Sequence, residues 1–334
     1  LSLHDALPIY YDMEKQVGAD IVNSISFFND VFGPMPFKNI NVTDMPIFHG
    51  EAFPGFIHLS FSTFLENGYD GSEEAFRAHE VAHQWWGISV GYNTYHDQWL
   101  SEGFATYSGL WFMQATLRDN DKFMDMLDNY KEEIMSNRNY LFSKGQQAGP
   151  IWLGYRTNSS ETEGDYNLII YKKGAWVLHM LRMMLLDLKT MNEDLFKNMM
   201  KDYYNSYKGK KANTEDFIKI VNKHFGEDMT WFFNQYVYNV EIPEYEFSYK
   251  TEITDGGKYQ VYCKMKQNNV PPDFKMYIPI LVKFDNDQFA RLRIFANGSN
   301  AIVKLPLLPL EPEEIIFNDL NSVLCEVDYT EWSE

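Results

Sequence analysis

His79-Glu80-Val81-Ala82-His83 lies within Ser72–Ile88, a stretch whose apolar spacing predicts a helix. Histidines four residues apart on a helix project from one face, so both imidazoles can bind one metal ion. Glu80 lies beside them, where its carboxylate can take a proton from a water molecule. The five residues alone also occur on helices whose histidines are ordinary surface residues, so the motif needs a third ligand to be specific for a metal.

The third ligand is found in a second predicted helix, Trp99–Leu117, which begins Trp-Leu-Ser-Glu-Gly. A catalytic zinc ion takes three protein ligands and keeps one position open. Eighteen residues (84 to 101) separate His83 from Glu102, so two antiparallel helices can bring the three side chains to one point. We therefore predict one Zn²⁺ per chain, held by His79, His83 and Glu102.

Three segments carry a resemblance to a known family. Residues 79–87 read H-E-V-A-H-Q-W-W-G, and residues 97–105 read D-Q-W-L-S-E-G-F-A. Together they resemble the gluzincin zinc metallopeptidases of the aminopeptidase N and leukotriene hydrolase family, which usually has Asn in place of Ser101. Residues 171–175, Y-K-K-G-A, resemble the family's Y-x-K-G-A element. The resemblance implies that Tyr171 donates a hydrogen bond to the oxyanion of the tetrahedral intermediate. Tyr166 matches a second family tyrosine more weakly and is a candidate for substrate binding.

The same family suggests how a substrate amine would be bound. Family aminopeptidases carry G-A-M-E-N-W-G ahead of the zinc helix, and the Glu of that segment holds the free amine. Residues 49–55 here read H-G-E-A-F-P-G, and His49–Pro54 is a turn-like segment between two strand-like runs, Asn39–Phe48 and Gly55–Phe61. Aligned on Gly55, the family's Glu falls on Ala52, and Glu51 comes one residue early, which reverses its face on a strand. A bulge at Pro54 would return Glu51 to the cleft, so Glu51 is the candidate substrate-binding carboxylate.

The resemblance covers about residues 10–240 and implies a mainly helical, thermolysin-like zinc catalytic domain. After Pro243 the pattern changes to short alternating runs separated by turns, which is typical of a β-sandwich. We therefore predict an α+β fold with a catalytic domain at 10–240 and a small β-sandwich domain at 241–334. The other predicted helices of the catalytic domain are Met13–Phe32, Lys122–Tyr140, Lys172–Leu188, Glu193–Tyr207, Thr214–Phe225 and Thr230–Tyr238. Between two of them, Ser143–Tyr166 is predicted to be a long loop. The predicted strands of the second domain are Tyr245–Tyr249, Tyr259–Met265, Lys275–Phe284 and Phe289–Phe295.

Composition limits the function further. Hydrophobic residues make up 45% of 334 residues, enough for a packed core. A net charge of −18 with no basic cluster argues against nucleic-acid binding, and no apolar run reaches the ~18 residues that span a bilayer. Peptides are the expected partners, whereas localisation, oligomeric state and pairing of Cys263 with Cys325 stay open.

The first nine residues, L-S-L-H-D-A-L-P-I, resemble a translated reading frame of a short-read sequencing adapter. We expect them to be foreign to the protein, in which case its native N-terminus, with any signal peptide or N-terminal β-domain, lies outside this sequence.

The predicted function is zinc-dependent hydrolysis of peptide bonds, by an aminopeptidase that removes N-terminal residues, with Glu80 as general base. Two alternatives stay open: an endopeptidase or epoxide-type hydrolase on the same metal site, and a non-catalytic scaffold of the same fold. A scaffold would be free to lose its ligands or base, whereas His79, Glu80, His83, Glu102 and Tyr171 are all present. Side-chain preference, and the choice between exopeptidase and endopeptidase, cannot be predicted from these residues.

Overall fold

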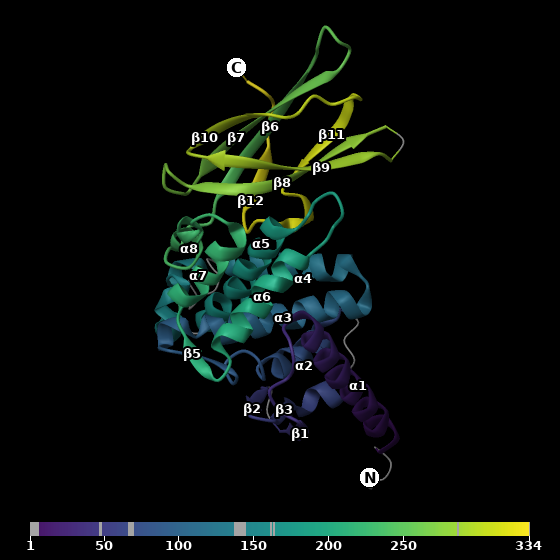
Figure 1. Ribbon diagram of the computed structural model, residues 1–334, viewed down its shortest axis with the longest axis vertical. Helices are drawn as coiled ribbons and strands as arrows, with labels where there is room; N and C mark the ends of the chain where they lie inside the picture. Colours follow the sequence, from purple (N-terminus) through teal and green to yellow (C-terminus); the bar gives the residue numbers. More distant parts are fainter. Residues whose placement is uncertain are drawn as a thin grey trace. The chain divides into compact units, whose positions relative to one another are not determined.

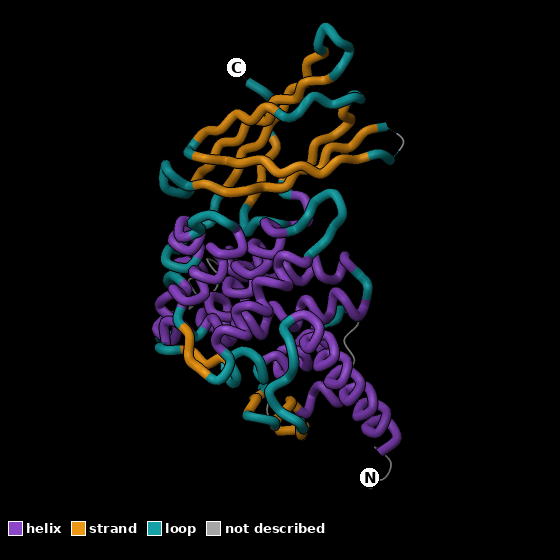
Figure 2. Tube along the Cα trace, viewed as in Figure 1, coloured by secondary structure: helices purple, strands orange, loops and turns teal. Residues whose placement is uncertain are grey.

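The computed structural model describes residues 7–46, 49–65, 70–136, 145–160, 162, 164–285 and 287–333, with the backbone alone for 7–12. The chain divides into two compact units, one of residues 1–178 and 194–230 and the other of residues 179–193 and 231–334 (Figure 1). Helices make up most of the first unit and strands most of the second (Figure 2). The predicted α+β class is confirmed. The predicted domains, 10–240 and 241–334, differ from these units because residues 179–193 and 231–240 group with the strands. Most of the expected adapter segment lies outside the described residues.

The first unit is built from long helices with short strands and turns between them. Its helices are α1 (Leu7–Val31), α2 (Ser72–Ala82), α3 (Trp99–Leu117), α4 (Asn120–Ser136), α6 (Asp194–Tyr207) and α7 (Thr214–Phe225), and α5 (Gly174–Leu185) and α8 (Thr230–Tyr236) run from it into the second unit. Its strands are β1 (Asn41–Met45), β2 (Glu51–Phe53), β3 (Phe56–Ser60), β4 (Val90–Tyr92) and β5 (Lys210–Ala212), and its 3₁₀ turns are η2 (Phe61–Phe64), η3 (Tyr95–Asp97), η5 (Gly145–Ala148) and η6 (Ile151–Thr157). The turns η5 and η6 lie inside the predicted long loop, which is therefore less irregular than its composition indicates.

Helix α2 begins where the sequence predicts but ends earlier. Asp70 Oδ1 accepts hydrogen bonds from the backbone N–H and the hydroxyl of Ser72, at 3.0 and 2.7 Å, which satisfies one of the free donors at the helix start. The helix ends at Ala82 rather than at Ile88, and the chain then turns through Gly87, whose φ of +95° favours glycine. His83 is therefore the C-terminal cap of α2 rather than an interior helix residue.

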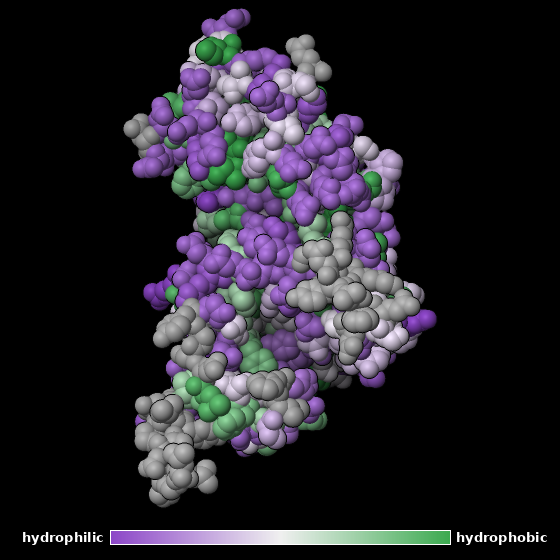
Figure 3. Space-filling view, turned by 180° about the vertical axis from the view of Figure 1, so that it is seen from behind, coloured by the Kyte–Doolittle hydropathy of each residue, from purple (hydrophilic) through white to green (hydrophobic). Residues whose placement is uncertain are grey.

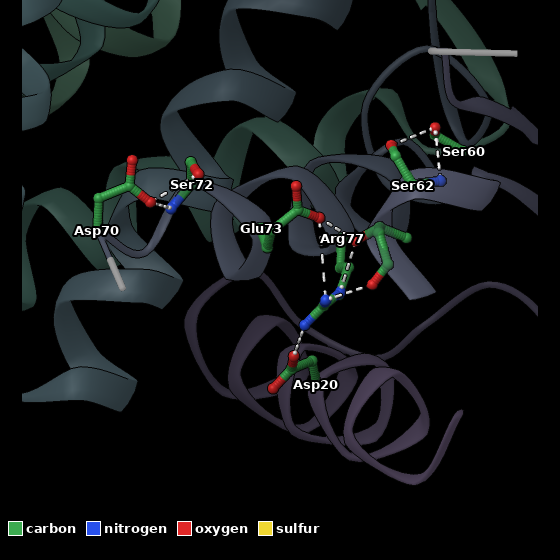
Figure 4. A network of polar contacts seen from close by, with 8 residues as sticks. Asp20, Ser60, Ser62, Asp70, Ser72, Glu73 and Arg77 are labelled. Atoms are coloured by element: carbon green, nitrogen blue, oxygen red, sulfur yellow. Dashed lines mark hydrogen bonds and ion pairs between the residues drawn. The ribbon is translucent and has the colours of Figure 1, made fainter. Parts of the chain in front are cut away.

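A buried arginine ties α2 to its surroundings (Figure 4). The Arg77 guanidinium is fully buried and donates to Asp20 Oδ2 on α1 at 2.6 Å and to the hydroxyl and carbonyl of Thr63 at 2.9 and 2.7 Å. Burial raises the pKa of Asp20, although the hydrogen bond and charge of Arg77 oppose the change. The sequence reasoning did not identify this network, which fixes the helix two residues before the first predicted zinc ligand.

The small sheet next to α2 has the order β1-β3-β2, so β2 is an edge strand. The prediction of a turn at residues 49–54 is wrong for Glu51–Phe53, which pairs antiparallel with β3. The turn is confined to Pro54 and Gly55, where Gly55 has a φ of +69°. The pairing of β2 with β3 shows no register shift, so the predicted bulge is absent from these strands.

The described residues of the second unit form two sheets. A four-stranded sheet has the order β10-β7-β6-β12, and a three-stranded sheet has the order β11-β8-β9. The Phe247 and Phe317 rings, one from each sheet, stack at 4.6 Å, as expected for a β-sandwich core. The strands are β6 (Glu244–Ile253), β7 (Tyr259–Asn268), β8 (Lys275–Phe284), β9 (Phe289–Asn297), β10 (Asn300–Lys304), β11 (Pro312–Phe317) and β12 (Glu326–Tyr329), with the 3₁₀ turn η8 (Asp319–Asn321) before β12. Cys263 and Cys325 are both buried, and no disulfide joins them.

Hydrophilic residues cover much of the face drawn in Figure 3, between smaller hydrophobic areas. Within the described part of the chain, each helix is too short or too polar to cross a membrane.

Candidate metal centre and active site

Helices α2 and α3 bring three possible metal ligands together. The Nε2 atoms of His79 and His83 lie 3.1 Å apart, and Glu102 Oε2 lies 3.7 Å from the first and 3.2 Å from the second. Among the described residues, this is the group whose geometry could hold a metal ion. Ligand atoms at about 2.0–2.1 Å from a tetrahedral zinc ion lie about 3.4 Å from one another, so the cluster has the size that zinc requires.

The orientation of His83 is fixed by a carbonyl group. Its Nδ1 lies 3.0 Å from the backbone oxygen of Trp86, which can only accept a hydrogen bond. Nδ1 must therefore carry the proton in the neutral ring, and Nε2 keeps its lone pair for a metal ion. The Ser101 hydroxyl lies 3.3 Å from the same Nδ1, so the residue that departs from the family pattern also contacts this ligand.

The orientation of His79 is fixed by a hydroxyl group. Thr106 donates its proton to the Glu102 carbonyl at 2.7 Å, and its oxygen lies 3.3 Å from His79 Nδ1. Because the single hydroxyl proton is already used, Thr106 accepts from Nδ1–H, and Nε2 of His79 again faces the cluster with its lone pair. Both rings are thus held in the tautomer that a metal ligand needs.

His83 and Glu102 shift each other's pKa. Burial lowers the pKa of His83, but the charge and hydrogen bond of Glu102 outweigh burial and raise it to about 9. Burial raises the pKa of Glu102, while His83 and His79 hold it well below its ordinary value. A metal ion must displace a proton from this site, which is the usual coupling between metal binding and protonation.

Glycines allow the helices to approach closely. A Cβ at Gly109 of α3 would lie 2.3 Å from the carbonyl of Ala75 on α2. A Cβ at Gly103 would lie 3.0 Å from Gly174, the first residue of α5. The contact between Gly103 and Gly174 brings the segment that carries Tyr171 against the segment that carries Glu102. It explains why both sequence motifs contain a glycine at this point.

Tyr171 lies on η7 (Asn167–Lys173), a π-helix directly before α5. Such turns occur frequently at functional sites. The Tyr171 ring stacks beside His79 at 5.8 Å. Burial and then the charge of Glu102 raise the pKa of Tyr171, so the phenol keeps its proton and is a donor. Tyr166 packs edge-on against Tyr171 at 5.7 Å and is not among the described residues that line the cavity.

A cavity of about 820 Å³ opens beside the cluster. Glu80 lines it together with the ligand residues, Tyr171 and residues 49–53. The Glu80 side chain is buried and lies against Gly50, where a Cβ would be only 2.3 Å from its Oε1. The Glu80 carboxylate is therefore held at the wall of the cavity by Gly50, where a larger residue would displace it.

Glu51 is more exposed to solvent than its predicted role in binding a substrate amine requires. Glu51 lines the cavity, but its side chain is 46% exposed and lies 3.7 Å from His49 Nε2. Its register partner is His58, whereas Ala52 pairs with the fully buried Ile57. Cross-strand partners share a face, so Ala52 takes the inward position and Glu51 the outward one.

Comparison with known proteins agrees with this site. The Peptidase family M1 domain matches residues 69–236, which is half of the chain. The chain belongs to peptidase family M1. The family is zinc-dependent, and the match contains all three clustered residues. The predicted family is confirmed.

The relatives of this M1 chain are distant and much longer. Aminopeptidase M1-B of Oryza sativa subsp. japonica is 25% identical over 215 residues, 62% of this chain and 23% of the relative. Aminopeptidase Q of Felis catus is 27% identical over 203 residues, 57% of this chain and 19% of the relative. The chain thus spans about a quarter or less of these relatives. The structure of Legionella pneumophila aminopeptidase A in complex with aspartic acid has the same fold, with a TM-score of 0.70 at 16% identity over 94% of this chain and 35% of that one.

The structure thus brings together His79, Glu80, His83, Glu102 and Tyr171, leaves Tyr166 behind Tyr171, and places Glu51 at an exposed rim. The sequence reasoning missed Thr106, although it lies four residues after Glu102 and therefore on the same helix face. It also missed Gln84, whose role depends on contacts with a distant segment.

Proposed function

We propose that this chain is the catalytic part of a zinc-dependent aminopeptidase that removes N-terminal residues from peptides. The observation that carries the proposal is the cluster of His79, His83 and Glu102, in which Trp86 and Thr106 hold both imidazoles with Nε2 towards one point. These residues would hold one Zn²⁺ per chain. When bound, zinc supplies a Lewis acid that polarises the scissile carbonyl and lowers the pKa of water.

Glu80 is the general base in this proposal. Its buried carboxylate would take a proton from the attacking water and then give that proton to the amine that leaves. The water oxygen forms the new bond to the carbonyl carbon, and the carbon–nitrogen bond breaks. Tyr171 keeps its hydroxyl proton and would donate a hydrogen bond to the oxygen on which negative charge develops.

Peptide binding would use the edge strand β2. An edge strand offers unpaired backbone groups with which an extended peptide can pair, and β2 lines the cavity beside Glu80. Glu51 would meet the free amine from the rim, and Tyr166 would support Tyr171 from behind. The outward position of Glu51 favours one rival, an endopeptidase that needs no amine contact, and cleavage of acetylated peptides distinguishes the two.

Glu80→Gln tests the proposal because it keeps the shape of the side chain and removes the proton acceptor. We expect kcat to fall by about 10²–10⁴ while the zinc content stays at the parent level. Glu132→Gln is the matched control, since Glu132 is an exposed carboxylate on α4 and should leave kcat unchanged. Near-parent turnover by Glu80→Gln would refute the mechanism, and a parent protein that binds zinc without cleaving any peptide would favour the scaffold.

A further inference from the structure

The side chain of Gln84 joins the zinc helix to the strand that borders the cavity. Gln84 follows His83 and is fully buried. Its Nε2 donates to the Phe53 carbonyl at 3.1 Å, and its Oε1 accepts from the Gly55 N–H at 3.0 Å. One partner is the last residue of β2 and the other lies in the turn that follows, so one amide bonds to the main chain on either side of Pro54.

This contact completes the attachment of β2 to α2. Directly before the strand, Gly50 lies against the Glu80 carboxylate, which a side chain at this position would displace. At its end, the Gln84 amide bonds the turn. Glu80 lies on α2 and Gln84 just after its end, and the two contact opposite ends of β2, Glu80 at Gly50 and Gln84 at Phe53. Among the described residues, β2 has a partner strand on one side only, and these two contacts therefore set how far its free edge lies from the metal cluster.

We propose that Gln84 is a positioning residue that holds β2 in register with Glu80 and the metal ligands, and so determines how tightly an extended peptide binds. The inference rests on the proposed function for its substrate but not for its geometry. Gln84 contacts the strand rather than the cluster, because its two polar atoms are both used by Phe53 and Gly55. Its removal should therefore affect peptide binding more than the chemical step.

A merely structural role would produce a different result, and the chain offers a matched control. Gln267 in β7 is also a buried glutamine whose amide bonds two backbone carbonyls, those of Phe274 at 3.0 Å and Gly298 at 2.6 Å. It belongs to the second unit. Gln267→Met should lower the melting temperature as Gln84→Met does, without changing peptide binding.

The test compares the zinc-loaded parent with Gln84→Met, Gln84→Glu and Gln267→Met. Met removes both hydrogen bonds, and Glu keeps the acceptor for Gly55 while losing the donor to Phe53. The measurements are zinc content, kcat and KM for a hexapeptide, the Kd of its analogue with a CH₂–NH link at the scissile bond, and amide hydrogen exchange of residues 50–60.

For Gln84→Met we expect KM and the analogue's Kd to rise about tenfold, kcat to change less than about threefold, and exchange at residues 50–60 to accelerate about tenfold at unchanged zinc content. The KM, Kd and exchange rates of Gln84→Glu should lie between those of Gln84→Met and the parent. If the Met variant does not fold, the Glu variant alone tests whether Gln84 positions β2.

Parent-like Kd and exchange in both Gln84 variants would overturn the inference, and so would loss of zinc or of kcat with unchanged KM. If the parent cleaves no peptide, the proposed function fails, while the analogue's Kd and the exchange still decide the role of Gln84.

Discussion

The two walls of the cavity are held in different ways. On one side, α2, α3 and η7 meet at glycine contacts, and the ligand side chains are oriented by Trp86 and Thr106. On the other side, β2 is an exposed edge strand attached to α2 through Gly50 and Gln84. The groups that perform chemistry are thus fixed by several buried contacts each, whereas the groups that would select a substrate depend on a few.

This difference predicts unequal responses to mutation. We call α2, α3 and η7 the helical wall of the cavity and β2 its strand wall. A change in the helical wall should abolish or strongly reduce activity without altering the choice of substrate. A change in β2 should alter the choice of substrate while the chemistry continues. The largest effects are therefore expected at the metal ligands and the smallest at Glu51.

Removal of a metal ligand should have the largest effect. His79→Ala, His83→Ala and Glu102→Ala each leave two ligands, so we expect zinc content to fall from about one per chain to near zero and activity to fall to background. The melting temperature should fall as well, because zinc binds the folded state. The control is His224→Ala, whose ring bonds Asp202 at 3.0 Å and has no role at the cluster. Full zinc content in all three ligand variants would exclude this coordination set.

Tyr171→Phe should have the next largest effect, because it keeps the ring and removes only the hydrogen-bond donor. We expect kcat to fall by about 10²–10³ with a modest change in KM, measured by steady-state kinetics on a peptide. Tyr166→Phe is the matched comparison, since its ring lies behind Tyr171, and it should cost less than about tenfold. An effect of Tyr171→Phe on KM alone would instead assign this residue to substrate binding.

Thr106→Val should weaken the metal site without removing a ligand. Valine has the same shape but cannot accept the hydrogen bond from His79 Nδ1, so we expect zinc affinity to fall about 10–100-fold in competition with a chelator. Thr106→Ser keeps the hydroxyl and should restore most of the affinity, and Thr116→Val on the exposed side of α3 should change nothing. Equal affinity in Thr106→Val and the parent would mean that the tautomer of His79 is fixed by other contacts.

The helical wall could be predicted from the sequence because a helix converts spacing into geometry. The spacing of four residues from His79 to His83 places two rings on one face, and Glu102 follows on the next helix. The end of α2 at Ala82 was not predictable from apolar periodicity, because it depends on the turn through Gly87. The π-helix Asn167–Lys173 was missed as well, since the predicted helix begins only at Lys172.

The strand wall could not be predicted in the same way. A three-residue strand such as Glu51–Phe53 has too few residues to show an alternating pattern, and its neighbours Pro54 and Gly55 indicate a turn. Its place beside the zinc helix follows from Gln84 and Gly50, which are far from each other in the sequence. Long-range contacts of this kind leave no local signal.

Glu51→Ala should have the smallest effect on catalysis. The Glu51 carboxylate is 46% exposed, and an ion pair in contact with solvent contributes only about 0.2–1 kcal/mol, against about 3–5 kcal/mol for the loss of one partner of a buried pair. We therefore expect kcat/KM for peptides with a free amine to fall less than about tenfold, and kcat/KM for the same peptides after acetylation to stay unchanged. Steady-state kinetics on matched free and acetylated peptides measures both.

The comparison of free and acetylated peptides distinguishes three possibilities for how the substrate amine is bound at the rim of the cavity. If acetylation lowers kcat/KM in the parent and Glu51→Ala removes that difference, the carboxylate binds the amine despite its outward position. If acetylation matters equally in both proteins, the amine contact is made by another group, and the inward residue Ala52 explains why β2 does not provide it. If acetylated and free peptides are cleaved equally by the parent, the edge strand binds internal segments of a peptide, and the enzyme is an endopeptidase. The metal cluster is the same in all three cases, because they differ only in which group, if any, binds the substrate amine.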